Sequence, residues 1–347
     1  MLKPRMEWLL VFVVASFALE VLTDSSTLIF LTSVVALIPL AGLIGQSTEE
    51  LAIYAGPQIG GLLNATFGNV TELIVGIFLV FSGEIGVVKA TLIGSVIGNL
   101  LLVLGMAFLI GGWSRIEQTF NRNSAGMHIS SLMIAVMGLI IPALFQILSK
   151  TSPSETHAVS MSVSAVLIVI YSLSLVFSLR THRSLFGSTA DQGEPQWQLR
   201  TSVTVLAVAT ALVAFMSEFL VDALEPAVRS LGVSKIFVGL IIIPIVGNAA
   251  EHASAVWLAA KDKMDVAIEI AIGSSAQVAL FVTPALVLIS LLTMPHLDYV
   301  FTPLEIAAVG VSTVIAGFLA LDGRSNWLAG AQLLAAYVIL AVTFYFL

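Results

Sequence analysis

The sequence has no cysteine, only five histidines and only 10% charged residues. Without cysteine the chain cannot form disulfide bonds, zinc-thiolate sites or iron-sulfur clusters, although the redox compartment stays undetermined. The catalytic patterns HExxH and GxSxG do not occur either. We place four of the histidines in or near loops: His128, His157, His182 and His296. These absences argue against an intramembrane hydrolase, so we do not expect an enzyme.

Apolar residues take the place of the charged ones. Hydrophobic residues make up 58% of the chain, and its mean hydropathy is +1.05. This composition is typical of an integral membrane protein. A spanning helix needs about 20 predominantly apolar residues, and we place eleven such stretches at 7–22, 26–45, 50–81, 86–110, 125–148, 156–179, 201–221, 233–260, 265–292, 301–320 and 325–346. We therefore predict an all-α membrane protein with about 11 transmembrane helices.

Two of these stretches, 50–81 and 233–260, are longer than one crossing requires and carry Gly and Asn near their middles. They predict broken or tilted helices. The first stretch follows basic residues, as a signal peptide does, but it contains Glu20 and lacks a convincing cleavage site. We interpret it as a retained first helix.

The distribution of Lys and Arg predicts the orientation. With a cytoplasmic amino terminus, the inner loops contain Lys3, Arg5, Arg115, Arg122, Arg180, Arg183, Arg200, Lys261, Lys263 and Arg324. The outer loops then contain Lys89, Lys150, Arg229 and Lys235. Because cytoplasmic loops carry an excess of basic residues, we expect the amino terminus in the cytoplasm.

The longest hydrophilic stretch, THRSLFGSTADQGEPQWQLR, divides the chain into two halves. It contains Gly, Ser and Pro without hydrophobic periodicity, as a linker does. We predict four parts: an N-terminal helix at 1–25, a five-helix repeat at 26–180, a cytoplasmic linker at 181–200 and a second five-helix repeat at 201–347.

The two halves repeat one another when the sequence is shifted by 179 residues. GNVTE, which ends at Glu72, then falls on GNAAE, which ends at Glu251, and Ser95 falls on Ser274. In the predicted topology the two glutamate helices cross the membrane in opposite directions, so the repeats are inverted. Inverted repeats with interrupted helices are typical of secondary transporters, whose substrate site lies near the midplane. We therefore expect the two glutamates to face each other.

A bound cation explains two carboxyl groups inside the membrane, where an unpaired charge is costly. In each frame, Asn69 or Asn248 precedes the glutamate by three residues, which places both side chains on one face of a helix. The neighbouring Gly allows the backbone to open and present carbonyl oxygens. Calcium takes about six to eight oxygen ligands, and magnesium dehydrates reluctantly, so calcium fits better.

The helix after each frame adds polar residues that we expect to line the same cavity: Ser95, Asn99, Ser274 and Gln277. Packing and interhelical hydrogen bonding explain the serines equally well. We favour the site for Asn99 and Gln277. His252, which has Leu73 as its counterpart, is a candidate for proton coupling with Glu72 and Glu251, but a histidine that makes one interhelical hydrogen bond is an equal alternative.

These motifs resemble those of the cation/proton exchangers, the calcium/proton branch of the calcium/cation antiporter superfamily. The resemblance rests on the GNVTE and GNAAE frames, on the GSVIGN and GSSAQ segments that follow them, and on the number of predicted helices. It covers nearly the whole chain beyond the first helix. Sodium/calcium exchangers typically have GTSxPE-like and GTSxPD-like segments instead. The resemblance implies calcium efflux driven by proton entry, with Glu72 and Glu251 alternately binding calcium and protons.

Competition between the two ions follows from general chemistry as well. Calcium needs ionised carboxylates, whereas burial favours their neutral form, so an empty site takes up protons. Sodium-coupled exchange is the main alternative, and a cation channel is a weaker one. We expect calcium, protons and membrane lipid as partners, no nucleic acid, and no cofactor beyond the transported ions. A homo-oligomer is left open, and the short loops favour a prokaryotic inner membrane.

Overall fold

The computed structural model describes residues 6–149, 152–182 and 194–347, almost all of them helical. In these ranges, nine helices are long and apolar enough to span a membrane, or ten when one bent pair is counted as a span. The all-helical membrane architecture expected from the sequence is confirmed. The number of eleven spans is not reproduced, because α1 (Val11–Leu22) has only 12 residues and continues a short 3-10 helix, Met6–Leu10. Lys3, Arg5, Lys150, Arg183 and most of the linker lie outside the described residues.

The first half contains five spans in succession. Their elements are α2 (Ser26–Phe67), α3 (Val70–Phe81), α4 (Ile85–Ile97), a π-helical stretch (Gly98–Val103), α5 (Leu104–Gly112), α6 (Arg122–Ser149), and α7 (Pro153–Val176) with a π-helical end (Phe177–Thr181). A strand of two residues, β1 (Gln118–Thr119), precedes α6.

The second half follows the same order. Its elements are α8 (Leu199–Leu231), α9 (Lys235–Phe237), a π-helical stretch (Val238–Ile242), α10 (Ile243–Gly247), α11 (Ala249–Ala260), α12 (Met264–Ile268), α13 (Ser274–Gln277), α14 (Thr283–Ile289), α15 (Pro303–Asp322), β2 (Arg324–Ser325) and α16 (Trp327–Tyr345). Two further π-helical stretches, Glu269–Gly273 and Val278–Val282, connect α12 to α14, and a 3-10 turn, Ser290–Leu292, follows α14.

The boundary between the first two spans of the first half differs from the prediction. We expected a break between residues 45 and 50, within the polar sequence GQSTEE, but α2 continues through this sequence to Gly56. Gly56 has φ 77° and ψ 171°, which a residue with a side chain rarely adopts. It also precedes a proline, which disfavours helical geometry at the position before it. The chain therefore turns at Gly56, and Gln46, Glu49 and Glu50 lie inside the helix before the turn.

The two long stretches are broken helices, as the sequence predicts, and they break at matched residues. Asn69, with φ −108° and ψ 23°, separates the end of α2 from α3. Asn248, with φ −102° and ψ 7°, separates α10 from α11, and the helices on its two sides are bent by 60°. The preceding Gly68 keeps helical angles. The asparagine, and not the glycine, is thus the point where the helix opens.

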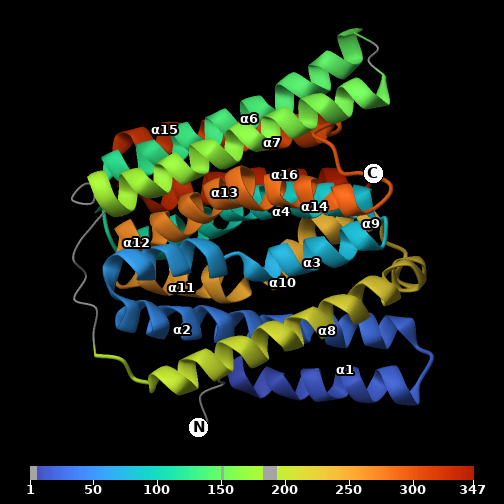
Figure 1. The fold of residues 1–347 in the computed structure, drawn as a ribbon. Coiled ribbons are helices and arrows are strands. Elements are labelled where there is room, and N and C mark those ends of the chain that lie inside the picture. Colours follow the sequence, from blue (N-terminus) through green and yellow to red (C-terminus); the bar gives the residue numbers. More distant parts are fainter. Residues whose placement is uncertain (1–5, 150–151, 183–193) are drawn as a thin grey trace.

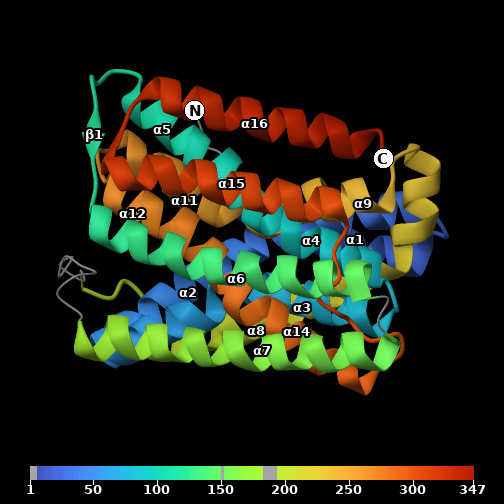
Figure 2. The same ribbon diagram turned by 90° about the horizontal axis from the view of Figure 1, so that it is seen from above.

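The helices form layers that run roughly parallel to one another (Figure 1). Helices α1, α2 and α8 lie together at one side, and α6, α7 and α15 lie at the opposite side. Helices α3, α4, α10 and α11 lie between these layers. The view from above shows α5 and α16 side by side at a third edge (Figure 2).

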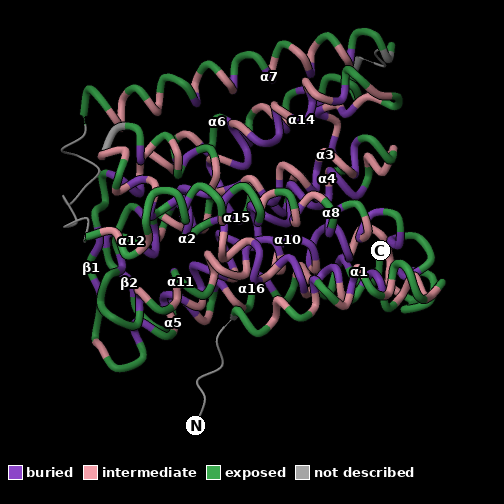
Figure 3. Tube along the Cα trace, turned by 60° about the horizontal axis from the view of Figure 1, so that its bottom comes forward, coloured by how far each residue is buried: buried purple, intermediate pink, exposed green. Residues whose placement is uncertain are grey.

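The halves interlock across the interior. Helix α8 of the second half packs on α3, the glutamate helix of the first half, while α2 of the first half packs on α11, the glutamate helix of the second. Burial follows this arrangement, because the central helices are mostly buried and α7 is largely exposed (Figure 3). Exposed apolar residues on the outer helices are expected for a surface that faces lipid.

Close packing in the interior depends on small residues. A side chain at Gly94 on α4 would collide with the backbone carbonyl oxygen of Leu240. Gly94 thus lets α4 lie directly against the π-helical stretch Val238–Ile242 of the other half. This contact gives the GSVIGN segment a packing role, as expected for small residues between membrane helices.

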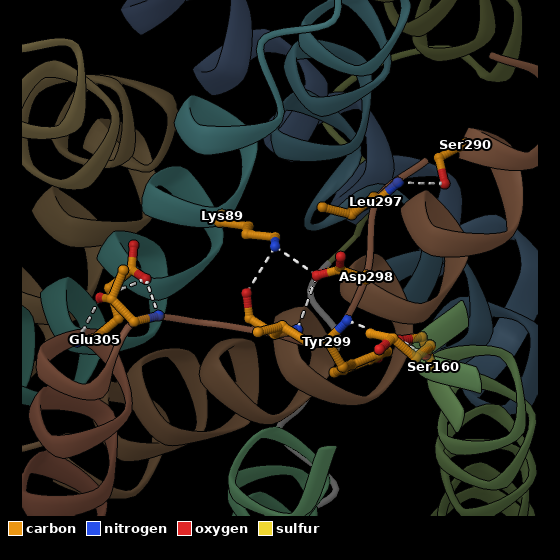
Figure 4. A network of polar contacts seen from close by, with 10 residues as sticks. Lys89, Ser160, Ser290, Leu297, Asp298, Tyr299 and Glu305 are labelled. Carbon is orange, nitrogen blue, oxygen red and sulfur yellow. Dashed lines mark hydrogen bonds and ion pairs between the residues drawn. The ribbon is translucent and has the colours of Figure 1, made fainter. Parts of the chain in front are cut away.

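The segment between residues 293 and 302 is tied to three helices (Figure 4). The Lys89 ammonium group lies 2.6 Å from Asp298 Oδ1 and donates to the Val300 carbonyl oxygen at 2.7 Å. The Tyr299 amide donates to Ser160 Oγ on α7 at 3.0 Å. Glu305 forms a capping box with Thr302 at the start of α15. These contacts fix the segment across the ends of α4, α7 and α15.

Candidate functional site

Both glutamates are placed by the helix breaks. Each is the third residue of a helix that begins inside the protein: Glu72 in α3 and Glu251 in α11. The amino terminus of a helix carries a partial positive charge, which stabilises an ionised carboxylate in the first turn. The breaks therefore supply two favourable positions for anionic side chains in an apolar interior.

The two carboxyl groups approach each other at the centre of the fold. Their charges lie close enough to interact. Glu72 is 5% exposed, and Glu251 is half-buried. The oxygens Glu72 Oε1 and Glu251 Oε2 are buried without a hydrogen-bond partner. An unsatisfied buried oxygen costs free energy unless an ion, a water molecule or a proton binds it.

Asn69 connects the two halves of the site. Its amide nitrogen donates to Gln277 Oε1 at 2.6 Å, and its amide oxygen accepts from Ser274 Oγ at 2.9 Å. The Ser274 hydroxyl also lies beside the Glu251 carboxyl group. Asn69 of the first half is therefore linked to the glutamate of the second half through one serine.

Asn248, at the matched position, is arranged differently. Its amide nitrogen donates to the Pro244 carbonyl oxygen at 3.1 Å, within its own broken helix. Its side chain lies beside the Glu72 carboxyl group. Ser95, the counterpart of Ser274, has a buried hydroxyl without a partner. The amide nitrogen of Asn248 thus bonds within its own half, whereas that of Asn69 bonds to the other repeat.

Asn99 and His252 form a further pair. His252 Nε2 and Asn99 Oδ1 are 3.1 Å apart, while Asn99 Nδ2 is buried without a partner. Because His252 directly follows Glu251, this contact joins the π-helical stretch Gly98–Val103 to the glutamate helix of the other half. Contacts connect the candidates named from the sequence except Ser95, whose buried hydroxyl has no partner, and their roles in ion binding stay predictions.

One detail of the sequence interpretation is wrong. Asparagine and glutamate do not share a face of one helix, because the helix breaks at the asparagine and the glutamate belongs to the next segment. The expectation that the breaks present carbonyl oxygens to an ion stays a prediction, and the carbonyl oxygens at two matched positions are bonded to side chains. The Ala65 carbonyl accepts from Tyr171 Oη at 2.9 Å, and the Pro244 carbonyl accepts from Asn248. Tyr171 was missed because a lone tyrosine in an apolar helix gives no signal in the sequence.

The donor set at the centre consists of oxygens, with His252 beside them. In the described ranges, no three His, Asp or Glu side chains converge on a point that could hold a metal ion. An ion at the centre would therefore be held by two carboxylates and neutral oxygens. Hard cations such as calcium prefer such ligands. The amide oxygens of Asn69, Asn99 and Gln277 each contact another side chain, so they act in this conformation as organisers of the site.

Other polar residues lie away from this centre. His128, which we placed in or near a loop, lies within α6 and contacts Glu269 at 2.9 Å. The His157 ring stacks on His296 at 4.8 Å. Glu225, near the end of α8, pairs with Arg229 at 2.5 Å, and both side chains are exposed. Glu50 lies inside α2 and accepts two backbone hydrogen bonds from the segment before α8.

Comparison with protein families gives a match over almost the whole chain. The family model described as sodium/calcium exchanger protein matches residues 25–180 and 201–346. A Ca(2+)/H(+) antiporter of Aphanothece halophytica is 43% identical over 335 residues, which cover 92% of this chain and 90% of the relative. The Ca(2+)/H(+) antiporter ChaA of Bacillus subtilis is 43% identical over 329 residues, which cover 93% of each chain.

Solved structures give the same picture. The native structure of YfkE superposes with a TM-score of 0.87 at 38% sequence identity and covers 99% of this chain and 100% of that chain. The H+/Ca2+ exchanger CAX superposes with a TM-score of 0.76 over 98% of this chain and 91% of that chain. Its identity is 13%, so this second likeness concerns the fold alone.

Proposed function

Because this chain belongs to the sodium/calcium exchanger protein family, and within it to the calcium/proton exchangers, we propose that it exchanges calcium for protons across a membrane. The observation that carries the proposal is the meeting of Glu72 and Glu251 at two matched helix breaks, each with one unpartnered buried oxygen. The names of its relatives, which are calcium/proton antiporters, support the choice of ions.

The two glutamates serve both ions by competition. Calcium binds when both carboxyl groups are ionised, and protons bind when calcium leaves, because two adjacent charges in an apolar interior are costly. The protein does not change between its inward-open and outward-open conformations while the site is empty and doubly charged. Only the forms that carry calcium or protons therefore change their orientation. This rule couples the two fluxes, and it requires no cofactor and no chemical reaction on a substrate.

Alternating access completes the mechanism. The inverted repeats and their broken helices support a rocking motion that opens the site to one side at a time. We propose that the amino terminus lies in the cytoplasm, that the membrane is a prokaryotic inner membrane, and that proton entry drives calcium out of the cell. The basic residues of the predicted inner loops support this orientation.

Calcium uptake into proteoliposomes with an imposed pH gradient tests the proposal. The wild type should take up calcium in response to the pH gradient and not to a sodium gradient. Glu72→Gln and Glu251→Gln should each lower uptake by about 100-fold, because the loss of a buried charge partner typically costs several kcal/mol. Sodium-driven uptake, or normal uptake by both variants, contradicts the proposal. Sustained single-channel currents would instead identify a channel.

A further inference from the structure

Glu50 is a buried carboxyl group that the ion-exchange mechanism does not use. It lies in α2, six residues before the break at Gly56, and is 6% exposed. One of its oxygens, Oε2, accepts the backbone N–H of Gln196 at 2.9 Å and that of Trp197 at 3.1 Å. Hydrogen bonds to an ionised carboxylate are stronger than those between neutral groups.

A third hydrogen bond reinforces this contact. Tyr54, one turn after Glu50, donates its hydroxyl to the Trp197 carbonyl oxygen at 2.6 Å. Helix α8 begins two residues later, at Leu199. One turn of α2 therefore holds both backbone polar groups of Trp197, immediately before the first helix of the other repeat.

The two helices that this contact joins cover the ion site. Helices α2 and α8 begin their respective repeats and pack along each other more extensively than any other pair of elements in the described ranges. Helix α8 lies on α3, which carries Glu72, and α2 lies on α11, which carries Glu251. A motion of one covering helix without the other would break the packing between α2 and α8 and would separate the moving helix from the glutamate helix that it contacts.

The opposite end of α8 is held by different partners. Lys235 Nζ lies 2.6 Å from Glu84 Oε1 and 3.5 Å from Glu225 Oε2, so it connects the end of α8 to the start of α4. At that end α8 is tied to the central helices, whereas at the linker end Glu50 ties it to α2. Helix α8 is thus bonded to the central helices at one end and to its neighbour α2 at the other end.

We propose that Glu50 is a positioning residue that joins α2 and α8 at their linker ends, so that the two helices move as one body when the site changes its access. This role rests on the proposed ion exchange, because it is a role in the change of access that the exchange requires. It does not concern the binding of the ion itself. Glu50 contacts neither the site nor the ion, so its loss should slow the change of access and leave calcium binding intact.

The rate of calcium uptake as a function of calcium concentration tests this separation. In Glu50→Ala the maximal rate should fall about tenfold, as expected when a positioning contact of a moving element is lost, while the half-saturating calcium concentration stays within about twofold. Glu50→Gln keeps an oxygen acceptor and should recover part of the rate. Glu49→Gln is the matched control, because the neighbouring Glu49 side chain is exposed, and it should behave like the wild type.

A distance measurement tests the joining itself without any transport. The chain has no cysteine in its sequence, so cysteines introduced at the exposed positions Gln46 and Thr201 carry the only spin labels. The wild type and Glu49→Gln should give one narrow distance distribution between the labels. Glu50→Ala and Glu50→Gln should broaden it, the alanine variant more strongly.

The two measurements separate this inference from the proposed function. An unchanged distance distribution in both Glu50 variants overturns the inference, as does a rise in half-saturating calcium with an unchanged maximal rate. If the wild type takes up no calcium under a pH gradient, the proposed function fails, but the distance distribution still decides whether Glu50 joins the helices. Should Glu50→Ala not fold, Glu50→Gln gives the same decision.

Discussion

The two repeats place the same residues at the same breaks but bond them differently. In the first, Glu72 is enclosed and Asn69 reaches across to Ser274 and Gln277. In the second, Glu251 is half-buried and Asn248 bonds to its own helix. Matched residues with different surroundings are expected of an inverted-repeat transporter. A site that is open to only one side of the membrane has two halves in different conformations.

The largest contrast that this comparison predicts concerns two matched glycines. Gly94→Ala should lower the free energy of unfolding by about 3 kcal/mol, because the new methyl group meets the Leu240 carbonyl oxygen. Gly273→Ala should cost less than about 1 kcal/mol, since its nearest neighbours, Glu269 and His128, lie 3.6 and 3.7 Å from the added carbon. Thermal unfolding in detergent measures both, and equal losses would contradict the asymmetric packing.

The asparagines give the next contrast. Asn69→Ala leaves Gln277 Oε1 and Ser274 Oγ without their partner and should destabilise the protein by about 2 kcal/mol. Asn248→Ala removes one local hydrogen bond and should cost about 1 kcal/mol, because the Pro244 carbonyl still accepts the backbone N–H of residue 248. Denaturation curves of the two variants under one condition decide the order. A larger loss in Asn248→Ala would show that the hydrogen bonds between repeats contribute little.

A smaller contrast separates the serines. Ser274→Ala should cost about 1 kcal/mol, since it removes the hydrogen bond to Asn69. Ser95→Ala removes a hydroxyl that has no partner in this conformation, and its effect on unfolding should stay within about 0.5 kcal/mol. Unfolding in the absence of calcium makes this comparison free of ligand effects. If the two variants are equally stable, the serines are equivalent and this contrast fails.

An effect on transport, of about the size of one hydrogen bond, is expected where the repeats differ in sequence. His252→Leu gives the second repeat the residue that the first has at Leu73, and it removes the contact with Asn99. One hydrogen bond is worth about 1 kcal/mol, so calcium uptake should fall by about threefold to fivefold. Asn99→Ala should have the same effect, and the double variant should be no worse than either single one. Effects that multiply in the double variant would mean that the two residues act independently.

Much of the site could be predicted from the sequence because its signals are local. An ionisable residue in an apolar stretch needs a partner, and its repetition at a spacing of 179 residues names that partner as Glu251 for Glu72. The amides and serines of the following helices were found by the same reasoning. The direction of each hydrogen bond was not predictable, because Asn69 and Asn248 have the same sequence frame and different neighbours.

Other errors have a common cause. Residues 46–49 were taken for a break between two spans, because a hydropathy pattern cannot distinguish a loop from a polar part of a helix that another segment covers. Glu50 is buried and accepts the backbone N–H groups of Gln196 and Trp197, which are distant in sequence. Tyr171 likewise caps the Ala65 carbonyl. Contacts between residues more than 100 positions apart leave no local pattern to read.

The sequence by itself predicted that the chain crosses a membrane, that its two halves repeat and that Glu72 and Glu251 form a pair, because each of these predictions follows from composition, periodicity or identity at a fixed spacing. The tertiary structure decided where the helices break, which asparagine bonds to Ser274 and Gln277 of the other repeat, and which carboxyl group accepts the backbone N–H groups before α8. These features depend on the backbone angles of single residues and on neighbours supplied by the other half, which only the folded chain brings together.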